Sequence, residues 1–135
     1  MNEEDDSMNK QDLEERLISF AVLVIAIIES MPNTRAANHM GGQLLRSGTS
    51  PALNYGEAQS GESRNDFIHK IKIVLKELRE SHVGLRIIHR SRLFSSEEKI
   101  LQALKEANEL ISIFVTSAKT AQINNQRSTS KISTR

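Results

Sequence analysis

A row of basic side chains in the second half of the chain is the pattern whose residue types could most directly do chemistry. When residues 63–90 are placed on a helix, at about 100° of rotation per residue, six of them fall within an arc of about 100°. They are His69, Lys72, Lys76, Arg79, Arg86 and Arg90, which we call the basic stripe. Cations at this spacing can follow a phosphate backbone, so the stripe is a candidate contact for nucleic acid or for a protein partner.

The basic stripe also has a simple structural interpretation as a solvated helix face. Glu80 lies close beside it, and almost no aromatic residues are interleaved with it, so stacking on bases is not expected. The chain has 18 Lys and Arg against 17 Asp and Glu, and its pI of about 8.1 is low for a dedicated nucleic-acid-binding domain. Composition therefore leaves both interpretations open.

A second candidate is a polar run over residues 46–58, RSGTSPALNYGEA, which interrupts an otherwise helical sequence. Its hydrogen-bonding side chains are Arg46, Ser47, Thr49, Ser50, Asn54 and Glu57. Such groups can satisfy the backbone at a helix break and can link this helix to the next one or to a neighbouring subunit. The alternative is a binding surface for a partner chain or nucleic acid, and we favour the structural interpretation.

The remaining reactive residues do not predict a catalytic centre. Di-iron four-helix bundles need two Glu-x-x-His pairs and two further carboxylates, whereas this chain offers only Asp66-x-x-His69. Asp66 is better explained as a charge in the first turn of a helix, and His82 as a hydrogen-bonded core histidine. The sequence has no cysteine, no phosphate-cradling glycine loop and no strand–turn–helix elbow. We therefore expect no catalytic residue, metal, cofactor or small-molecule substrate.

Four helices must position these groups. Apolar residues at alternating steps of three and four predict a helix over about 11–30, and further helices over about 34–59, 63–90 and 96–121. Gly48 can end a helical segment, and Ser50 followed by Pro51 is typical of an N-cap and a first helical residue. The second helix is therefore predicted to be interrupted near Gly48 and Pro51, giving pieces over about 34–47 and 51–59.

Length and composition fit one all-α domain. The 135 residues are 38% hydrophobic but only 4% aromatic, which suits the packing of helix on helix. Short connections predict an up-down-up-down four-helix bundle over residues 11–121. The acidic leader, residues 1–10, and the polar, basic tail, residues 122–135, are predicted to be disordered.

No targeting or membrane segment is expected. The apolar run over residues 17–31 is shorter than the stretch of about 20 apolar residues that spans a bilayer. It also follows an acidic leader, whereas a signal peptide begins with a basic one. The absence of cysteine is compatible with the cytoplasm, which we take as the expected location.

The polar run also carries a family resemblance. The matching segments are QLLRSGTS (43–50), NY with EA (54–55 and 57–58), SR (63–64), DFIHK (66–70) and KELRE (76–80). On these segments the chain resembles the 23S rRNA intervening-sequence protein family, a group of small bacterial four-helix bundle proteins. It departs from the family where Pro51 and Ala52 replace a branched apolar residue and glycine, and where Val83 and Gly84 replace a frequent aromatic pair.

The resemblance implies a left-handed four-helix bundle that assembles as a homo-oligomer, with a five-membered ring favoured, and it implies no known enzymatic activity. Related bundles include the accessory variability protein of diversity-generating retroelements, a basic pentamer that binds reverse transcriptase and nucleic acid. We therefore expect a non-enzymatic oligomeric interaction protein whose partner is RNA, DNA or a nucleic-acid enzyme such as a reverse transcriptase. The alternative is a purely structural or protein-binding homo-oligomer with no nucleic-acid role.

The first and last helices carry more apolar residues than a narrow packing seam requires. Ile18, Ile25, Leu110 and Ile113 lie outside that seam. Either the core stripe of these helices is wide, or the two helices make contacts between subunits. Because the resemblance implies an oligomer, we favour contacts between subunits.

Overall fold

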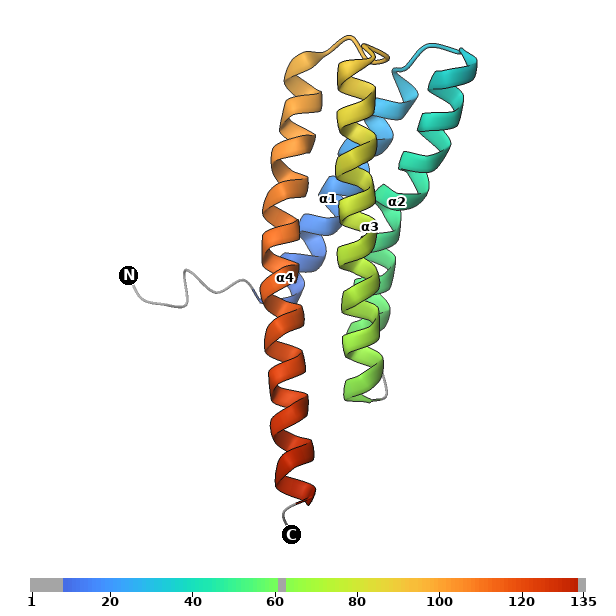
Figure 1. Ribbon diagram of the computed structural model, residues 1–135. Helices are drawn as coiled ribbons and strands as arrows, with labels where there is room; N and C mark the ends of the chain where they lie inside the picture. Colours follow the sequence, from blue (N-terminus) through green and yellow to red (C-terminus); the bar gives the residue numbers. More distant parts are fainter. Residues whose placement is uncertain (1–8, 61–62, 134–135) are drawn as a thin grey trace, which may run out of the picture.

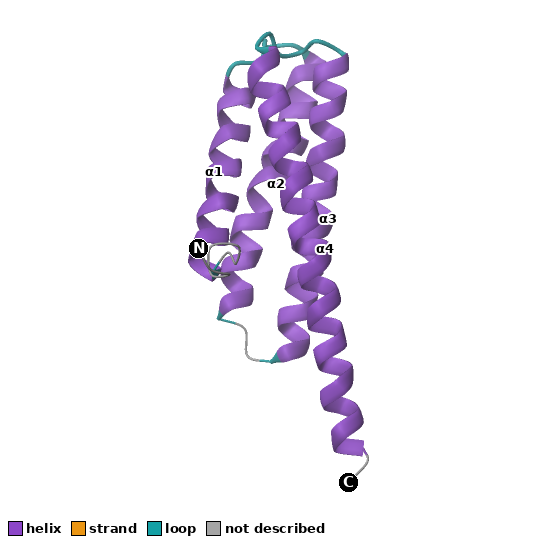
Figure 2. Cartoon of the chain, turned by 90° about the vertical axis from the view of Figure 1, so that its left-hand side faces the viewer, coloured by secondary structure: helices purple, strands orange, loops and turns teal. Residues whose placement is uncertain are grey.

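The structure, a computed structural model, describes residues 9–60 and 63–133, with side chains as far as residue 127. These residues form four helices: α1 (Lys10–Glu29), α2 (Arg35–Gln59), α3 (Arg64–Arg90) and α4 (Glu97–Ser133). The predicted all-α four-helix bundle is confirmed, and consecutive helices run in opposite directions (Figures 1 and 2). None of the helices in the described ranges is long and apolar enough to cross a membrane.

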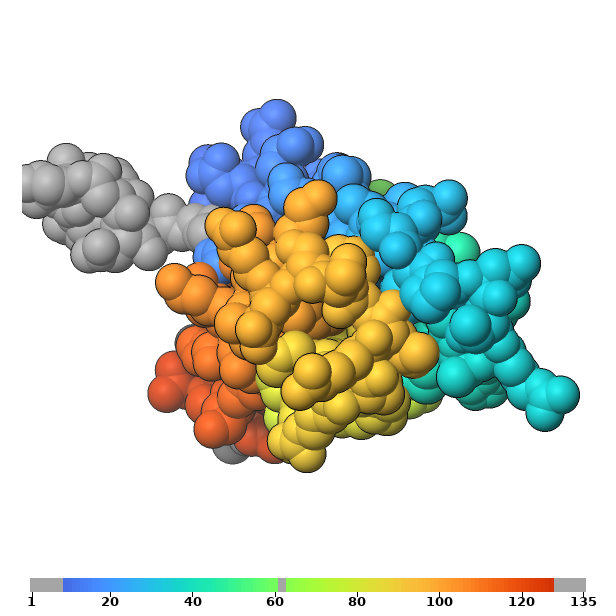
Figure 3. Space-filling model, turned by 90° about the horizontal axis from the view of Figure 1, so that it is seen from above, coloured from blue at the N-terminus to red at the C-terminus, as the bar shows by residue number. Residues whose placement is uncertain are grey.

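Each helix packs against two neighbours in a closed ring. α2 lies between α1 and α3, and α4 lies between α3 and α1, as the view down the bundle shows (Figure 3). The seam between α1 and α4 is the loosest of the four. The helices that face each other diagonally, α1 with α3 and α2 with α4, therefore meet only through side chains in the core.

The apolar periodicity of the sequence becomes the core. In α1 the predicted stripe of Leu13, Leu17, Phe20, Val24 and Ile27 is buried. The other helices contribute further fully buried side chains: Leu44, Ile71, Leu78, Leu85, Ile88, Ile100, Leu110 and Phe114. Burial of these faces, more than helix propensity, holds the four elements together.

Hydroxyl side chains cap the N-terminal ends of α2, α3 and α4. The hydroxyl oxygens of Thr34 and Ser63 each accept a hydrogen bond at 3.1 Å from the backbone amide three residues further on. These are the N-cap contacts expected for α2 and α3. In α4 the corresponding contact is made by Ser96, whose Oγ accepts a bond from the Lys99 amide at 3.4 Å.

The predicted interruption of α2 is wrong, because α2 is one helix from Arg35 to Gln59 with Pro51 inside it. Gly48 serves a different purpose from ending a helix: a Cβ at this position would lie 2.8 Å from Val24 Cγ1, so glycine lets α1 and α2 approach closely. Pro51 lacks the amide that would bond to the Ser47 carbonyl. Pro51 is buried, as Tyr55 is one turn later, and this packing offsets the lost bond.

The C-terminal end of α4 also differs from the prediction. The helix continues past Ala121 to Ser133, through residues for which the sequence predicts a disordered tail (Figure 1). No glycine or proline stops it there, and adding residues to an existing helix costs little. Asn125 Nδ2 donates to Asn65 Oδ1 at 3.3 Å, which ties the extension to the first turn of α3. Most of the predicted acidic leader, residues 1–8, lies outside the described residues.

Candidate functional site

All six residues of the basic stripe are exposed on the outer face of α3. None of them forms an ion pair or a side-chain hydrogen bond within residues 9–60 and 63–127. The prediction from helical spacing that these residues share one solvent-facing arc therefore agrees with their exposure. Their charges are available to a partner, because no contact inside this part of the chain uses them.

Two carboxylates of α3, Glu77 and Glu80, pair with an arginine of α2. Arg46 Nη1 donates to Glu77 Oε1 at 2.9 Å, and Arg46 Nη2 donates to Glu80 Oε2. The hydrogen bond to Glu80, together with the charges of both carboxylates, raises the pKa of Arg46 above its ordinary value. Glu80, whose charge opposes the stripe in the sequence, is therefore balanced by a cation that does not belong to the stripe.

Three side chains of the polar run join α2 to α3 at successive levels. Besides the Arg46 pairs, Ser81 Oγ donates to Ser47 Oγ at 3.0 Å, with both hydroxyls buried. Near the C-terminal end of α2, Lys70 Nζ of α3 donates to Glu57 Oε1 at 2.5 Å. These bonds fix the register of α3 on α2 and so set the direction in which the basic stripe faces.

The other three side chains of the run bond within α2. Thr49 Oγ1 donates to the Leu45 carbonyl at 2.7 Å. Asn54 Nδ2 donates to the carbonyl and the hydroxyl of Ser50, at 3.0 and 2.8 Å. Such local bonds occupy the polar groups without a ligand. A role for this run in contacts between subunits stays a prediction.

An apolar face that spans α1 and α2 is exposed to solvent. Its large side chains are between 40% and 66% exposed. They are Ile18, Val22 and Ile25 on α1, and Leu45 and Leu53 on α2. We call this surface the α1–α2 apolar face. Exposed apolar residues gathered over two adjacent helices are typical of an interaction surface.

The register of the two helices brings these residues to the same levels. Gly48 lies opposite Val24, since a Cβ on the glycine would touch that side chain. The helices are antiparallel, so Ile25 lies near the level of Leu45, and Ile18 lies near that of Leu53. The exposed apolar residues of α1 and α2 therefore lie side by side along the bundle.

The sequence predicted this surplus of apolar residues only in part. Ile18 and Ile25 are exposed as expected. Leu110 is 0% exposed and Ile113 is half-buried, so the prediction of a contact surface on α4 is wrong for Leu110. Leu110 is buried because it lies on the core stripe of α4, between Ala107 and Phe114 at steps of three and four residues. Leu45 and Leu53, spaced by eight residues on α2, were the signal that the sequence analysis missed.

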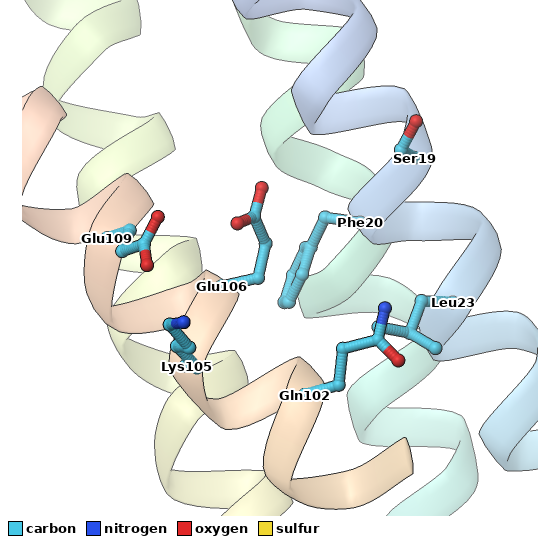
Figure 4. A pocket seen from close by; sticks show the side chains of 7 residues that line it. All are labelled: Ser19, Phe20, Leu23, Gln102, Lys105, Glu106 and Glu109. Carbon is cyan, nitrogen blue, oxygen red and sulfur yellow. The ribbon is translucent and has the colours of Figure 1, made fainter. Parts of the chain in front are cut away.

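A groove of about 360 Å³ follows the loose seam between α1 and α4 (Figure 4). Phe20 and Leu23 line it from α1, and Glu106 reaches towards Phe20 from α4. Arg16 crosses the same seam: its Nε and Nη2 donate to Glu106 at 2.8 and 2.7 Å, and Nη2 also donates to Glu109 at 2.7 Å. The hydrogen bond to Glu106 is the main cause that raises the pKa of Arg16. The polar groups of the groove thus fasten α1 to α4.

The residues considered for metal chemistry do not converge. Asp66 and His69 are exposed at the start of α3. Among the described residues, no group of three or more His, Asp or Glu side chains could hold a metal ion. His82 is half-buried and not a fully buried core residue as predicted. Its partial burial is the main cause that lowers its pKa, and the charge of Arg86 lowers it further.

Comparison with known proteins agrees with the fold and with the matching segments. The sequence model of the family described as 23S rRNA-intervening sequence protein matches residues 9–117, from the N-cap of α1 into α4. A crystal structure from Bacteroides thetaiotaomicron VPI-5482, of a protein with unknown function from the S23 ribosomal protein family, has a TM-score of 0.73 and 29% sequence identity. The match covers 79% of this chain and 98% of that chain. No curated protein matches. The chain belongs to the 23S rRNA-intervening sequence protein family.

Proposed function

We propose that this protein is a non-enzymatic, oligomeric interaction protein of the bacterial cytoplasm that binds nucleic acid through the basic stripe. One observation carries the proposal: six exposed basic side chains share one face of α3 while Arg46 pairs with Glu77 and Glu80 on the same helix. A surface of this kind attracts phosphates and releases their counterions on binding. A nucleic-acid enzyme such as a reverse transcriptase is the protein partner that we propose, because it would bind the same nucleic acid.

The dimensions and chemistry of the stripe indicate contact with the backbone and not with the bases. From His69 to Arg90 the helix rises by roughly 30 Å, the length of about nine base pairs. The four Phe and the single Tyr of the chain are all buried or half-buried, so no phenyl or phenol ring is exposed for bases to stack on. We therefore propose binding that depends strongly on salt and little on sequence.

Charge reversal on the stripe is expected to abolish this binding. The triple variant Lys72→Glu, Lys76→Glu and Arg79→Glu should lower the affinity for RNA or DNA by about 100-fold or more, because three attractive contacts become repulsive. Electrophoretic mobility shift over a salt series measures the effect, and wild-type binding should weaken as salt rises.

A matched triple on α4 controls for net charge. Lys99→Glu, Lys105→Glu and Lys119→Glu change the charge by the same amount at exposed positions away from the stripe. This variant should keep most of the affinity. The proposal is wrong if the wild type gives no shift at low salt, or if both triples lose binding equally.

The alternative function is a structural homo-oligomer without a nucleic-acid role, and the α1–α2 apolar face favours it. We propose that this face forms the contact between subunits, with the five-membered ring that the family resemblance implies. Val22 is 60% exposed near the middle of the face. Val22→Glu would bury an unpaired charge in the contact and should reduce the oligomer to monomers at micromolar concentration.

Light scattering on Val22→Glu measures the mass directly. Ile123→Glu, at an equally apolar but separate position on α4, should leave the mass unchanged. An unchanged mass in Val22→Glu would mean that the contact between subunits lies on another surface. A wild-type oligomer that gives no shift with RNA or DNA at low salt would select the structural function over the nucleic-acid one.

A further inference from the structure

A cavity of about 600 Å³ opens at the turn between α3 and α4. It lies at the end of the bundle that Figure 3 views from above. His89 and Arg90 line it from the last turn of α3, Arg92 and Ser95 from the connection, and Glu97 from the start of α4. Phe94, which is 8% exposed, also lines the cavity and anchors the connection in the core. Two arginines thus line a hollow at the end of the basic stripe, to which Arg90 also belongs.

The charges around this cavity are unevenly paired. His89 Nε2 lies 3.1 Å from Glu97 Oε2, so the one carboxylate that lines the cavity already has a partner. Arg90 and Arg92 are exposed and make no ion pair within the part of the chain that the structure describes. Two guanidinium groups are therefore left for an anion, and guanidinium groups match the geometry of phosphate oxygens.

The backbone at Arg92 provides a separate observation. Arg92 has a φ of 58°, the left-handed region, and is the only non-glycine residue with positive φ among the described residues. Its amide donates to the His89 carbonyl at 3.2 Å, and the next amide, of Leu93, donates to the Ile88 carbonyl at 3.1 Å. This is a Schellman motif, whose left-handed position is normally glycine. Arginine adopts this conformation at an energetic cost, and such costs are typical of residues whose side chains have a function.

We propose that this cavity binds a terminal phosphomonoester, with the phosphate held between the guanidinium groups of Arg90 and Arg92. Ser95 adds a hydroxyl donor at the rim. The same chemistry is offered by the phosphorylated end of a nucleic-acid strand and by a free mononucleotide. The strand end is the source we favour, and this choice rests on the proposed function. Arg90 belongs to both the stripe and the cavity, so a strand that follows the stripe ends at the cavity.

The test compares ligands that differ only in the terminal phosphate. One short oligonucleotide is prepared with a 5′-phosphate, with a 3′-phosphate and with neither, and a nucleoside monophosphate is used alone. Fluorescence anisotropy measures the affinity for each oligonucleotide, and calorimetry measures the affinity for the mononucleotide. A phosphorylated end should bind about tenfold more tightly than the unphosphorylated strand, the worth of one charge-assisted contact.

Two variants should move binding in opposite directions. Arg92→Gly should remove the preference for the phosphorylated end while raising Tm by roughly 4 °C, because glycine fits the left-handed position. Glu97→Gln removes the carboxylate beside the cavity and should tighten phosphate binding several-fold. Arg64→Gln, which removes one exposed charge at the other end of α3, should leave the preference unchanged. A damaged fold could not produce this combination of results.

The outcomes separate this proposal from the proposed function. Equal binding of all three strands, or a preference that survives Arg92→Gly, overturns the phosphate site while the stripe can still bind nucleic acid. If no strand binds but the mononucleotide does so in an Arg92-dependent way, the site stands with the free nucleotide as its ligand, and the nucleic-acid function fails.

Discussion

A leucine at Gly48 is expected to lower the free energy of unfolding by about 2 kcal/mol, whereas a leucine at Gly42 leaves it equal or higher. Both glycines lie inside α2, where leucine or alanine favours the helix by about 1 kcal/mol over glycine. A Cβ at Gly42 would meet nothing within 4 Å, so that gain is kept. The different results expected at these two glycines of one helix come from packing alone.

The expected loss of stability at position 48 arises from contact with one residue, Val24. A Cβ there would lie 2.8, 3.1 and 3.2 Å from Cγ1, Cγ2 and Cβ of Val24. Val24 is fully buried and β-branched, so it cannot rotate away, and α1 and α2 must separate. Overpacking of a core costs about 1–3 kcal/mol and sometimes more, which exceeds the helix gain.

Urea unfolding at one fixed protomer concentration measures these variants, because an oligomer would make stability depend on concentration. Gly48→Ala should fall between the wild type and Gly48→Leu. Val24→Ala leaves room for the new methyl group, so the double variant with Gly48→Ala should be more stable than the sum of the single losses. If Gly48→Ala stabilises as much as Gly42→Ala, the close approach of the helices is not what requires glycine.

Gly48 also shows where prediction from the sequence stops. Glycine followed by Ser50 and Pro51 is typical of a helix end, and the same glycine is typical of close helix packing. Which meaning applies depends on what lies opposite, and Val24 is distant in the sequence. The buried stripe of α1 needed no such information, because its periodicity of three and four residues is local.

The same division holds for the candidate site. The arc of the basic stripe follows from helical geometry, so the exposure of Lys72 or Arg79 could be predicted. The pairing of Arg46 with Glu77 and Glu80 could not, because it depends on the register of α2 on α3. Arg92 carries no local signal of its left-handed backbone, since glycine and not arginine marks that position in sequences.

The second large effect is expected at Phe114, whose replacement by alanine should lower the free energy of unfolding by about 4 kcal/mol. Phe114 lies on α4 and is 0% exposed. Its ring meets that of Tyr55 edge-to-face, with centroids 5.6 Å apart and planes at 80°. Tyr55 belongs to α2, the helix diagonally opposite, so this pair closes the centre of the bundle between helices whose backbones do not meet.

Graded variants distinguish a lost ring contact from a lost volume. Phe114→Leu keeps most of the volume and should cost about 1.5 kcal/mol, and Ile123→Ala, exposed on the same helix, should change stability by less than about 0.5 kcal/mol. A double-mutant cycle with Tyr55→Ala should show a coupling of about 1 kcal/mol, the worth of an edge-to-face pair beyond its buried area. Additive losses would mean that the two rings act only as separate core residues. A loss below about 1 kcal/mol for Phe114→Ala would mean that α2 and α4 are held in place by their contacts with α3, which lies between them in the ring, and not by this pair of rings.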